Sequence, residues 1–450
     1  MEMHGTIAVW DKGKLTLYET TQGVVNHHNV AAQMLYSCPN IAGVQHVAPL
    51  NVGTPTPMRG PGRTPALFAI ESAMDELAIK LNMDPLELRL RNDAETDEAS
   101  QRPWSSKHVR EAYQIGAERF GWSKRHPQVG SMRRGDAILG WGMATCTWPG
   151  HQMHAEVRVR LLADGTAQAA CATQDIGTGT YTVFAEVVSD RTGIPVEKVQ
   201  VVLGDSSLPP GPTSGGSAAP ASVLPAIAKA TDNAVTALLK AASKAPGAPF
   251  APAEPKTLKM SQGRVHLQDK APESGVPFQQ ILALQKLAGL DGQAKTGADT
   301  AQKQYAIHSF GAHFCEVAFD PDIVPLRVTR WLTVIDGGRM INQKAARNQI
   351  IGSVVMGIGM GMLEETIYDS TTGHSVNNNY ADYLVAVQTD IPEIECVFLD
   401  YPDTVLNAYG TRGIGEIGLT GCAAALTSAT YHATGIRVRE LPIRIEKLLV

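Results

Sequence analysis

A single carboxylate stands in the glycine-rich run GTRGIGEIGLTG, residues 410–421, where small and apolar residues surround Glu416. An acid in this setting is either a solvated loop carboxylate or a general base whose pKa is raised by apolar neighbours. Arg59 occupies a comparable setting in MRGPG. An arginine there either pairs structurally with an acid or presents its guanidinium fork to a substrate carbonyl or carboxylate. Both residues are therefore candidates for a role in catalysis.

Three more loops combine glycine with hydroxyl or amide side chains. Glycine lets backbone N–H groups approach a bulky polar ligand, and neutral hydroxyls suit phosphate oxygens. Each loop taken alone is typical of an ordinary tight turn. Together with the Glu416 run, they favour a pterin-like or nucleotide-like ligand. The loops are Gln174–Thr180 (QDIGTGT), Gly204–Ser207 (GDSS) and Thr213–Ser217 (TSGGS).

Several other motifs argue against better-known sites. The chain lacks Gly-x-x-x-x-Gly-Lys, which excludes a P-loop, and GIGMGM at 357–362 lies within a helical pattern that predicts a helix-packing surface. The pairs His27–His28 and His151–His154 have no third ligand at a sensible spacing, so we expect no metal bound by protein side chains. The six cysteines form no Cys-x-x-Cys pair, which excludes an iron–sulfur cluster and indicates buried thiols of a reducing compartment.

The composition favours a small-molecule enzyme or an assembly subunit. The 39 basic and 44 acidic residues give a pI near 6.2, which offers no broad positive field for nucleic acid or an anionic membrane. No apolar run reaches membrane-spanning length, so we expect no membrane insertion. The opening MEMHGTIAVWDKGK has no signal-peptide pattern, and we expect a partner to carry the protein if it leaves the cytoplasm.

The elements that must position these residues follow in mixed order, which predicts an α+β fold rather than a doubly wound sheet. Alternating residues predict a hairpin over 1–20, and cap signals predict helices beginning at Thr64-Pro65 and Asp84-Pro85. The remaining expectations are a strand–strand–helix–strand unit over 155–205, an alanine-rich helix over 221–244, an irregular insertion over 256–304, strands over 313–319 and 326–336, and helices over 343–365 and 422–435.

The motifs occur together in an order that resembles one family. The chain is similar to the molybdopterin-binding large subunit of the xanthine dehydrogenase and aldehyde oxidase family, particularly the three-subunit bacterial aldehyde oxidoreductases. The matching segments are MEMHGTIAVW with TTQGV, MRGPG with ESAMDELAIKLNMDPLELRLRND, QDIGTGTYT, GDSSLPPGPTSGG, GRMINQKAARNQIIGSVVMGIGMGMLEE and GIGEIGLTG. They span almost the whole chain.

The resemblance implies roles for particular residues. It implies that Glu416 is the catalytic base, which takes a proton as a water-derived oxygen is transferred to the substrate carbon. It implies that Arg59 orients the substrate. It also implies a molybdenum-hydroxylase fold, with a first cofactor-binding domain over 1–135 and the second over 136–450, interrupted by a connector near 245–256. The implied cofactor contacts are Gln174, Gly177, Thr178, Gly179, Thr180, Ser206, Ser207, Thr213, Ser214, Gly215, Gly216, Ser217, Gln349 and Gly415.

The resemblance also implies the cofactor and the assembly. The cofactor would be molybdenum–molybdopterin in its cytosine dinucleotide form, and the reaction would hydroxylate an aldehyde or an N-heterocycle with water as the oxygen source. A [2Fe–2S] subunit and an FAD subunit would complete a heterotrimer and carry the electrons away. The expected location is cytoplasmic, or periplasmic if a signal-bearing partner exports the complex.

The sequence departs from the family pattern in two places. It begins at the MEMHG-like segment, and residues 29–38 bridge directly across a Gly-Gly-Phe-Gly loop and a long αβ stretch found in the family. We therefore expect uncovered sheet edges and apolar faces, with poor solubility or obligate partners as the result. A shortened, non-catalytic cofactor-binding or assembly chain is the alternative function, and an unrelated nucleotide-binding module would require an ATP or NAD motif that the sequence lacks.

Overall fold

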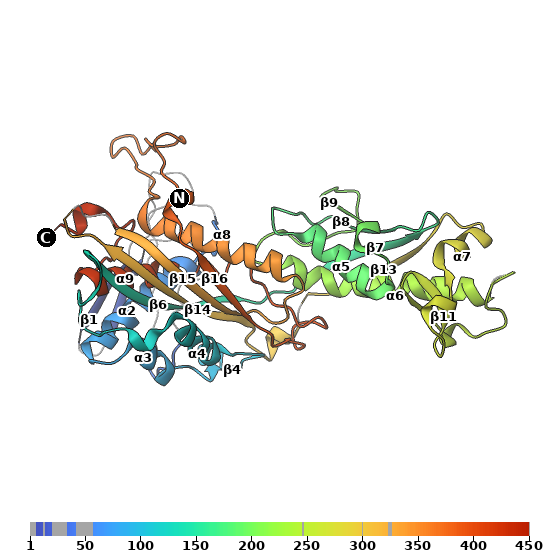
Figure 1. Ribbon diagram of the computed structural model, residues 1–450, viewed down its shortest axis with the longest axis horizontal. Coiled ribbons are helices and arrows are strands. Elements are labelled where there is room, and N and C mark those ends of the chain that lie inside the picture. The colour runs from blue at the N-terminus through green and yellow to red at the C-terminus, as the bar shows by residue number, and fades with distance from the viewer. Residues whose placement is uncertain are drawn as a thin grey trace. The chain divides into compact units, whose positions relative to one another are not determined.

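The computed structural model describes residues 6–11, 14–19, 34–41, 57–244, 247–298, 300–322 and 326–449 (Figure 1). The chain forms two compact units. Unit 1 comprises Met1–Pro149, Gln302–Tyr401 and Ile414–Val450, and unit 2 comprises Gly150–Ala301 and Pro402–Gly413. In the described part of the chain, no helix is long and apolar enough to cross a membrane.

Unit 1 is built on a five-stranded sheet with the strand order β16-β15-β14-β6-β5. Neighbouring strands are antiparallel, except for the parallel pair of β15 and β16. The register places His313 of the central strand opposite Ala144 on one side and Thr333 on the other. The strands are β5 (Met132–Arg134), β6 (Ala137–Pro149), β14 (His308–Phe319), β15 (Leu326–Asp336) and β16 (Ile394–Leu399).

Helices cover both faces of this sheet, and α8 and α4 lie on opposite sides of it (Figure 1). Side chains alternate along β14, so Cys315 and Val317 enter one core with α8 and α9, while Phe314 enters the other with α4. Gly140 lets α9 cross β6 closely, since a Cβ there would lie 1.9 Å from the carbonyl oxygen of Ala429. The helices are α2 (Arg63–Lys80), α3 (Pro85–Arg91), α4 (Val109–Phe120), α8 (Gln343–Met362) and α9 (Cys422–Thr434).

Unit 2 contains a four-stranded sheet in the order β13-β7-β8-β9. β7 and β8 form an antiparallel hairpin, and the chain then crosses over through α5 to place β9 parallel to β8. The long helix α6 packs on β7 and β13. The elements are β7 (Ala155–Leu162), β8 (Ala167–Cys171), α5 (Thr180–Thr192), β9 (Val199–Leu203), α6 (Ala219–Lys244) and β13 (Gly289–Thr296).

Smaller elements complete the two units. Unit 1 adds two two-stranded sheets, β1 (Thr6–Asp11) with β2 (Lys14–Glu19) and β3 (Thr96–Asp97) with β4 (Arg102–Pro103). Unit 2 adds the sheet β10-β11-β12 (Leu258–Ser261, Arg264–Leu267, Val276–Pro277) and helix α7 (Phe278–Leu284). Short 3-10 turns are η1 (Trp122–Lys124), η2 (Val196–Lys198), η3 (Pro255–Thr257), η4 (Pro272–Ser274), η5 (Ala301–Lys303), η6 (Gln388–Asp390) and η7 (Ile445–Lys447).

The structure confirms the predicted α+β fold and most of the predicted elements, with two corrections. The N-terminal hairpin pairs as predicted, although the ends of the segment 1–20 and its turn lie outside the described residues. The prediction that Thr64 caps a helix is wrong, because α2 begins at Arg63 with Gly62 before it. The irregular insertion predicted over 256–304 is also wrong, because this segment forms β10, β11, β12, α7 and β13.

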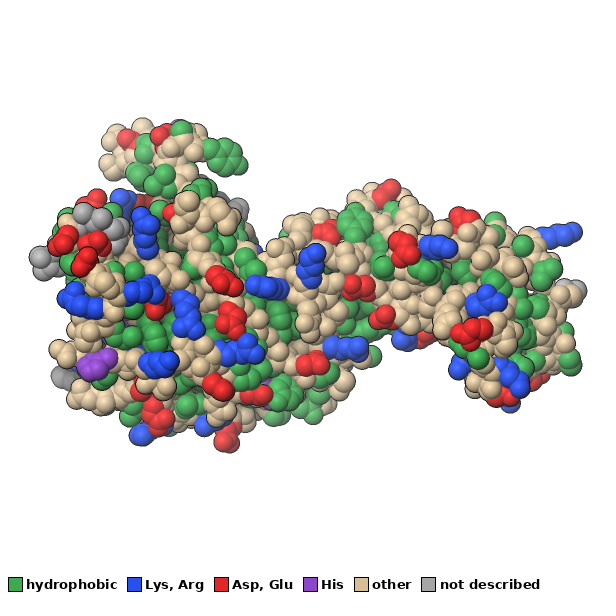
Figure 2. All heavy atoms as spheres, viewed as in Figure 1, with side chains coloured by type: hydrophobic (Ala, Val, Ile, Leu, Met, Phe, Trp, Pro, Cys, Tyr) green, Lys and Arg blue, Asp and Glu red, His purple; other side chains and the backbone are tan. Residues whose placement is uncertain are grey.

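A long excursion of unit 1, residues 363–393, separates α8 from β16. It exposes large apolar side chains, and hydrophobic atoms are visible over this projection in Figure 2. Tyr380 is 99% exposed and Leu384 is 58% exposed. Local hydrogen bonds shape the excursion, since Asn377 is buried and its side chain bonds the backbone of Glu365 and Ile367 at 2.6 and 2.9 Å. Unit 1 therefore presents several large apolar side chains to solvent along this excursion.

Candidate active site

Unit 1 brings Arg59 and Glu416 together from distant parts of the sequence. Arg59 lies just before α2, and Glu416 lies in the turn that leads into α9. The guanidinium Nε of Arg59 donates a hydrogen bond to the carbonyl oxygen of Gly415 at 2.6 Å. The backbone N–H of Gly60 donates to the Oε1 of Glu416 at 3.3 Å. Two consecutive residues therefore hold the backbone beside Glu416 and its carboxylate.

The same guanidinium bonds to α8. Its Nη2 donates to the backbone oxygen and to the side-chain Oε1 of Gln349, at 2.9 and 3.1 Å, and its Nη1 lies 3.7 Å from the Sδ of Met356. Burial lowers the pKa of Arg59 below its ordinary value, and the nearby carboxylate of Glu416 opposes this effect. An arginine keeps its charge under such a shift. Arg59 therefore places a positive charge next to the candidate base.

Glycines make the close approach possible. Gly60 has φ 74°, and a Cβ there would lie 2.4 Å from the Oγ1 of Thr64. Gly418 faces Ser353 of α8, where a Cβ would lie 2.8 Å from the serine Cβ. Because real Cβ atoms do not approach that closely, the Glu416 turn can lie on α8 only with glycine at this position.

The far end of the turn is held by the central sheet. The hydroxyl of Thr420 exchanges hydrogen bonds with the backbone of Thr147, both at 3.2 Å. The Nε2 of buried His313 donates to the carbonyl oxygen of Thr420 at 3.1 Å, and its Nδ1 lies 2.8 Å from the Oγ1 of Thr333. Burial lowers the pKa of His313 to about 4, so the ring is neutral at pH 7. His313 was not predicted, because a lone histidine within a strand gives no distinguishing signal.

The segment GIGMGM forms a helix-packing surface, as the sequence predicts. A Cβ at Gly357 would lie 2.5 Å from the Cβ of Cys422, and one at Gly361 would lie 2.5 Å from the Cδ2 of Leu426. These glycines let α8 lie directly against α9. The Glu416 turn therefore leads into a helix that packs directly against α8.

The predicted cofactor loops of unit 2 gather at the end of β8. The Oγ of Ser214 donates to the backbone oxygen of Gln174 at 2.7 Å, and the backbone N–H of Gln174 donates back to that Oγ at 3.2 Å. The N–H of Gly204 donates to the oxygen of Thr173 at 2.9 Å, and the Thr173 hydroxyl donates to Pro212 at 2.9 Å. The three loops therefore form one exposed, hydrogen-bonded group within unit 2.

Two aspartates accept hydrogen bonds from loop N–H and hydroxyl groups, some of which the resemblance assigns to the cofactor. The Oδ1 of Asp175 accepts hydrogen bonds from the N–H groups of Gly177 and Thr178 at 2.8 and 2.9 Å. Its Oδ2 accepts a hydrogen bond from the backbone N–H of Tyr181 at 3.2 Å. Partial burial would raise the pKa of Asp175, but these backbone donors hold it below its ordinary value. Asp205 bonds in the same way to the N–H and hydroxyl of Ser207, at 2.8 and 2.7 Å. Neither aspartate stands at the N-cap of a helix, so the sequence gives no capping signal for these contacts.

These loops fit a bulky polar ligand, with one restriction. Gly177 and Gly204 have φ 93° and 81°, and a Cβ at either would meet no atom within 4 Å. Their backbones therefore border open space, and the hydroxyls of Ser206 and Thr213 belong to exposed residues. The carboxylate of Asp175 accepts a hydrogen bond from the N–H of Tyr181 in the first turn of α5, so an anionic group there would have to displace that side chain.

Gln349 and Gly415 belong to the Arg59 group rather than to the loops of unit 2. The described ranges contain no group of three or more His, Cys, Asp or Glu side chains that could hold a metal ion. His154 lies 3.2 Å from Glu156, whereas His27 and His28 lie outside the described residues.

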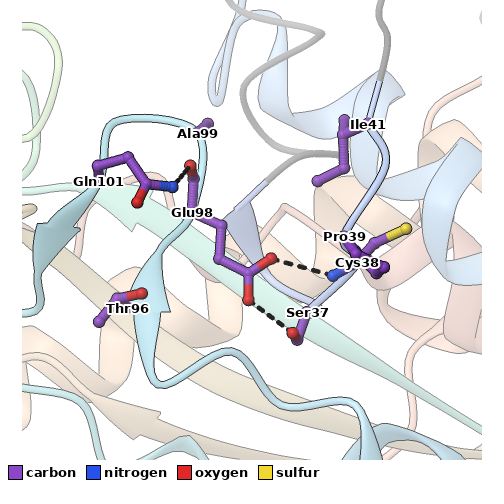
Figure 3. A pocket seen from close by; sticks show the side chains of 8 residues that line it. All are labelled: Ser37, Cys38, Pro39, Ile41, Thr96, Glu98, Ala99 and Gln101. Atoms are coloured by element: carbon purple, nitrogen blue, oxygen red, sulfur yellow. Dashed lines mark hydrogen bonds between the residues drawn. The ribbon is translucent and has the colours of Figure 1, made fainter.

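A separate cavity of about 680 Å³ lies elsewhere in unit 1 (Figure 3). Its carboxylate, Glu98, accepts hydrogen bonds from the hydroxyl of Ser37 at 2.5 Å and from the N–H of Cys38 at 3.0 Å. These two bonds, with Ser37 the stronger influence, lower the pKa of Glu98. The residues that line the cavity are Ser37, Cys38, Pro39, Ile41, Thr96, Glu98, Ala99 and Gln101, and they include none of the predicted site residues.

Comparison with known proteins gives a consistent result. Residues 115–392 match a molybdopterin cofactor-binding domain, and residues 31–93 match a second domain of that description. The chain is 34% identical over 423 residues to the aldehyde oxidoreductase molybdenum-binding subunit PaoC of Escherichia coli, covering 93% of this chain and 55% of that protein. It is 30% identical to the putative xanthine dehydrogenase molybdenum-binding subunit XdhA of Escherichia coli, covering 87% of this chain and 52% of that protein.

Solved structures share the fold. Quinoline 2-oxidoreductase from Pseudomonas putida superposes with a TM-score of 0.74 at 22% identity, covering 88% of this chain and 53% of that one. Aldehyde oxidoreductase from Desulfovibrio gigas gives 0.72 at 24% identity, covering 94% and 44%. The chain spans about half the length of the curated relatives that it matches.

The domain matches define a molybdopterin cofactor-binding chain, and the α+β fold is the one expected of it. It belongs to the family of molybdopterin-binding subunits of xanthine dehydrogenases and aldehyde oxidoreductases.

Proposed function

We propose that this chain is the cofactor-binding part of an oxidoreductase that hydroxylates an aldehyde or an N-heterocycle, with water as the oxygen source and Glu416 as the general base. The observation that carries the proposal is the setting of Glu416, whose Oε1 accepts from the N–H of Gly60 beside the guanidinium of Arg59. When bound, molybdenum–molybdopterin supplies the oxygen-transfer and two-electron chemistry. Glu416 takes the proton released from the attacking oxygen, and Arg59 supplies a fixed positive charge beside it.

We propose that the loops Gln174–Thr180, Ser206–Ser207 and Thr213–Ser217 contact the cofactor, which we assign as the cytosine dinucleotide form. Their glycine backbones and hydroxyls support this role. Gln349 and Gly415 are proposed as further contacts of the cofactor. We also propose that the chain contains two cofactor-binding domains, over residues 1–135 and 136–450. None of the proposed protein contacts is a metal ligand.

A heterotrimer with a [2Fe–2S] subunit and an FAD subunit is the proposed assembly. One relative of this chain is named as the gamma subunit of the 6-hydroxypseudooxynicotine dehydrogenase complex of Paenarthrobacter nicotinovorans, at 26% identity. We propose a cytoplasmic location, with export alongside a signal-bearing partner as the alternative.

The test compares wild-type chain with Glu416→Gln after coexpression with both partner subunits and the cofactor-maturation machinery. Molybdenum and releasable cytidine nucleotide per chain measure cofactor binding, and aldehyde turnover measures activity. We expect near-stoichiometric cofactor in both chains and a loss of kcat of at least about 100-fold in Glu416→Gln, the scale of a lost general base. Glu446→Gln is the matched control, because Glu446 is exposed and lies outside the Glu416 turn.

A second function has its own supporting observation. Asp175 and Asp205 already engage several donors of the loops and leave fewer of them to position a cofactor, which suits a non-catalytic cofactor-carrying or assembly chain. Cofactor bound without turnover in the wild-type complex would favour this alternative. Retained turnover in Glu416→Gln would refute the assignment of the base.

A further inference from the structure

The contacts of Arg59 are made with protein groups on two different elements. Nε donates to Gly415 on the Glu416 turn, while Nη2 donates twice to Gln349 on α8. Nη1 lies along α8, 3.7 Å from the Sδ of Met356. The planar guanidinium therefore ties the turn to the helix.

We infer that Arg59 is a positioning residue for Glu416, which fixes the turn on α8 through Gly415 rather than gripping the substrate with its fork. The catalytic consequence of this inference rests on the proposed function, whereas the structural part does not. Gly415 precedes Glu416 directly, so its carbonyl shares a planar peptide unit with the Glu416 nitrogen. Holding that oxygen sets the direction in which the glutamate side chain leaves the backbone.

The neighbouring residue strengthens this hold. Gly60 follows Arg59 in the chain and donates its N–H to the Glu416 carboxylate. One dipeptide thus fixes both the backbone before the base and one of its carboxylate oxygens. Through Arg59 and Gln349, the position of the base is tied to helix α8. Attachment to a rigid element keeps a catalytic group within a fraction of an ångström of its productive position.

Lysine cannot replace this arrangement. A lysine keeps the charge, but it has a single nitrogen and no planar fork, so it cannot reach Gly415 and Gln349 in their two directions at once. Arg59→Lys therefore distinguishes the effect of the positive charge from the effect of the hydrogen bonds to Gly415 and Gln349. If the charge alone mattered, the lysine variant would behave like the wild type.

The first experiment measures amide hydrogen exchange in the full chain without cofactor. The amides of Leu419 and Thr420 report on the turn, because they donate to Glu416 and Ile417 at 3.0 and 3.1 Å. We expect exchange at these amides to be at least tenfold faster in Arg59→Lys and Arg59→Met, with α9 unchanged. Lys344→Met is the matched control, because it removes a cation from an exposed position of α8.

Unchanged exchange in both Arg59 variants would overturn the inference. Arg59→Lys keeps the buried charge, so it carries the test by itself if Arg59→Met does not fold. Because this readout needs neither molybdenum nor substrate, it decides the structural claim even if the complex shows no turnover.

The second experiment uses the cofactor-loaded complex and an aldehyde substrate. A positioning role predicts that Arg59→Lys lowers kcat by about 10- to 100-fold and changes KM by less than about twofold, because the loss is confined to the transition state. A KM increase with kcat preserved would assign Arg59 to substrate binding and refute the positioning role. A wild-type complex without turnover would count against the proposed function alone, and the exchange result would still stand.

Discussion

Replacing Arg89 with methionine is expected to destabilise unit 1 strongly. Arg89 and Glu71 are both fully buried, and Nε of Arg89 lies 2.8 Å from the Oε2 of Glu71. The same Oε2 accepts from the N–H of Thr145 at 2.7 Å, and the hydroxyl of Tyr36 donates to Oε1. Burial alone would lower the pKa of Arg89, but Glu71 and its neighbours hold it above its ordinary value.

The expected loss of unfolding free energy follows from leaving a buried charge without its partner. Arg89→Met removes the cation and leaves the Glu71 carboxylate buried without its partner, which typically costs about 3–5 kcal/mol. That loss is a large share of a usual unfolding free energy of about 5–15 kcal/mol. Arg91→Met is the control on the same helix, because the Arg91–Glu87 pair is 61% and 46% exposed and should contribute at most about 1 kcal/mol.

Urea unfolding followed by tryptophan fluorescence measures this loss selectively. All six tryptophans of the chain lie in the segments that form unit 1, so the signal reports on that unit. Glu71→Gln in the Arg89→Met background should recover part of the loss, since it removes the stranded charge. A loss below about 1 kcal/mol in Arg89→Met, or one equal to that of Arg91→Met, would refute the reasoning.

Three further predictions concern other parts of the chain. The folded pKa of His313 is about 4, below its unfolded value of about 6.5, so the unfolded state takes up the proton first as pH falls; stability should decrease between pH 6.5 and 4 by on the order of 3 kcal/mol, and His313→Gln should flatten this decrease in tryptophan-monitored urea unfolding. Asp175→Ala should remove the hydrogen bond from the Tyr181 N–H and weaken the first turn of α5 by about 1 kcal/mol, measured by amide exchange across Thr180–Thr192, with unchanged exchange contradicting this contribution. Tyr380→Ser with Leu384→Ser should reduce self-association in sizing chromatography, and a monodisperse wild-type monomer would count against any need to cover that surface.

The sequence predicted the elements whose patterns are long and periodic. Buried and half-buried residues alternate strictly along β7, and α6 runs for 26 residues, so local signals were sufficient for both. The segment 256–304 failed because its strands β10, β11 and β12 have only four, four and two residues. β13 has only one buried residue among eight and pairs with β7, so its strand conformation depends on a partner far back in the chain.

The site shows the same division between local and non-local information. Residue types alone selected Arg59 and Glu416 as candidates, because an isolated charge among glycines is unusual. Their contact could not be predicted, since it depends on α8 and the central sheet bringing the two segments together. His313 was missed because a histidine in a strand carries no signal of its partners. The contacts of Asp175 were missed because they depend on how the loop before α5 folds around the carboxylate.

The position of Glu416 depends on nearby glycines, which have no side chain, as much as on hydrogen bonds. Gly418 lies against Ser353, and Gly421 lies against β6, where a Cβ would be 2.4 Å from the carbonyl oxygen of Thr145. The backbone N–H of Thr145 in turn donates a hydrogen bond to the buried carboxylate of Glu71. The buried ion pair and the turn that holds the candidate base therefore both contact Thr145 of β6. For this reason, a substitution at Arg89 that loosens β6 should also reach the Glu416 turn, although it removes no group from the site itself.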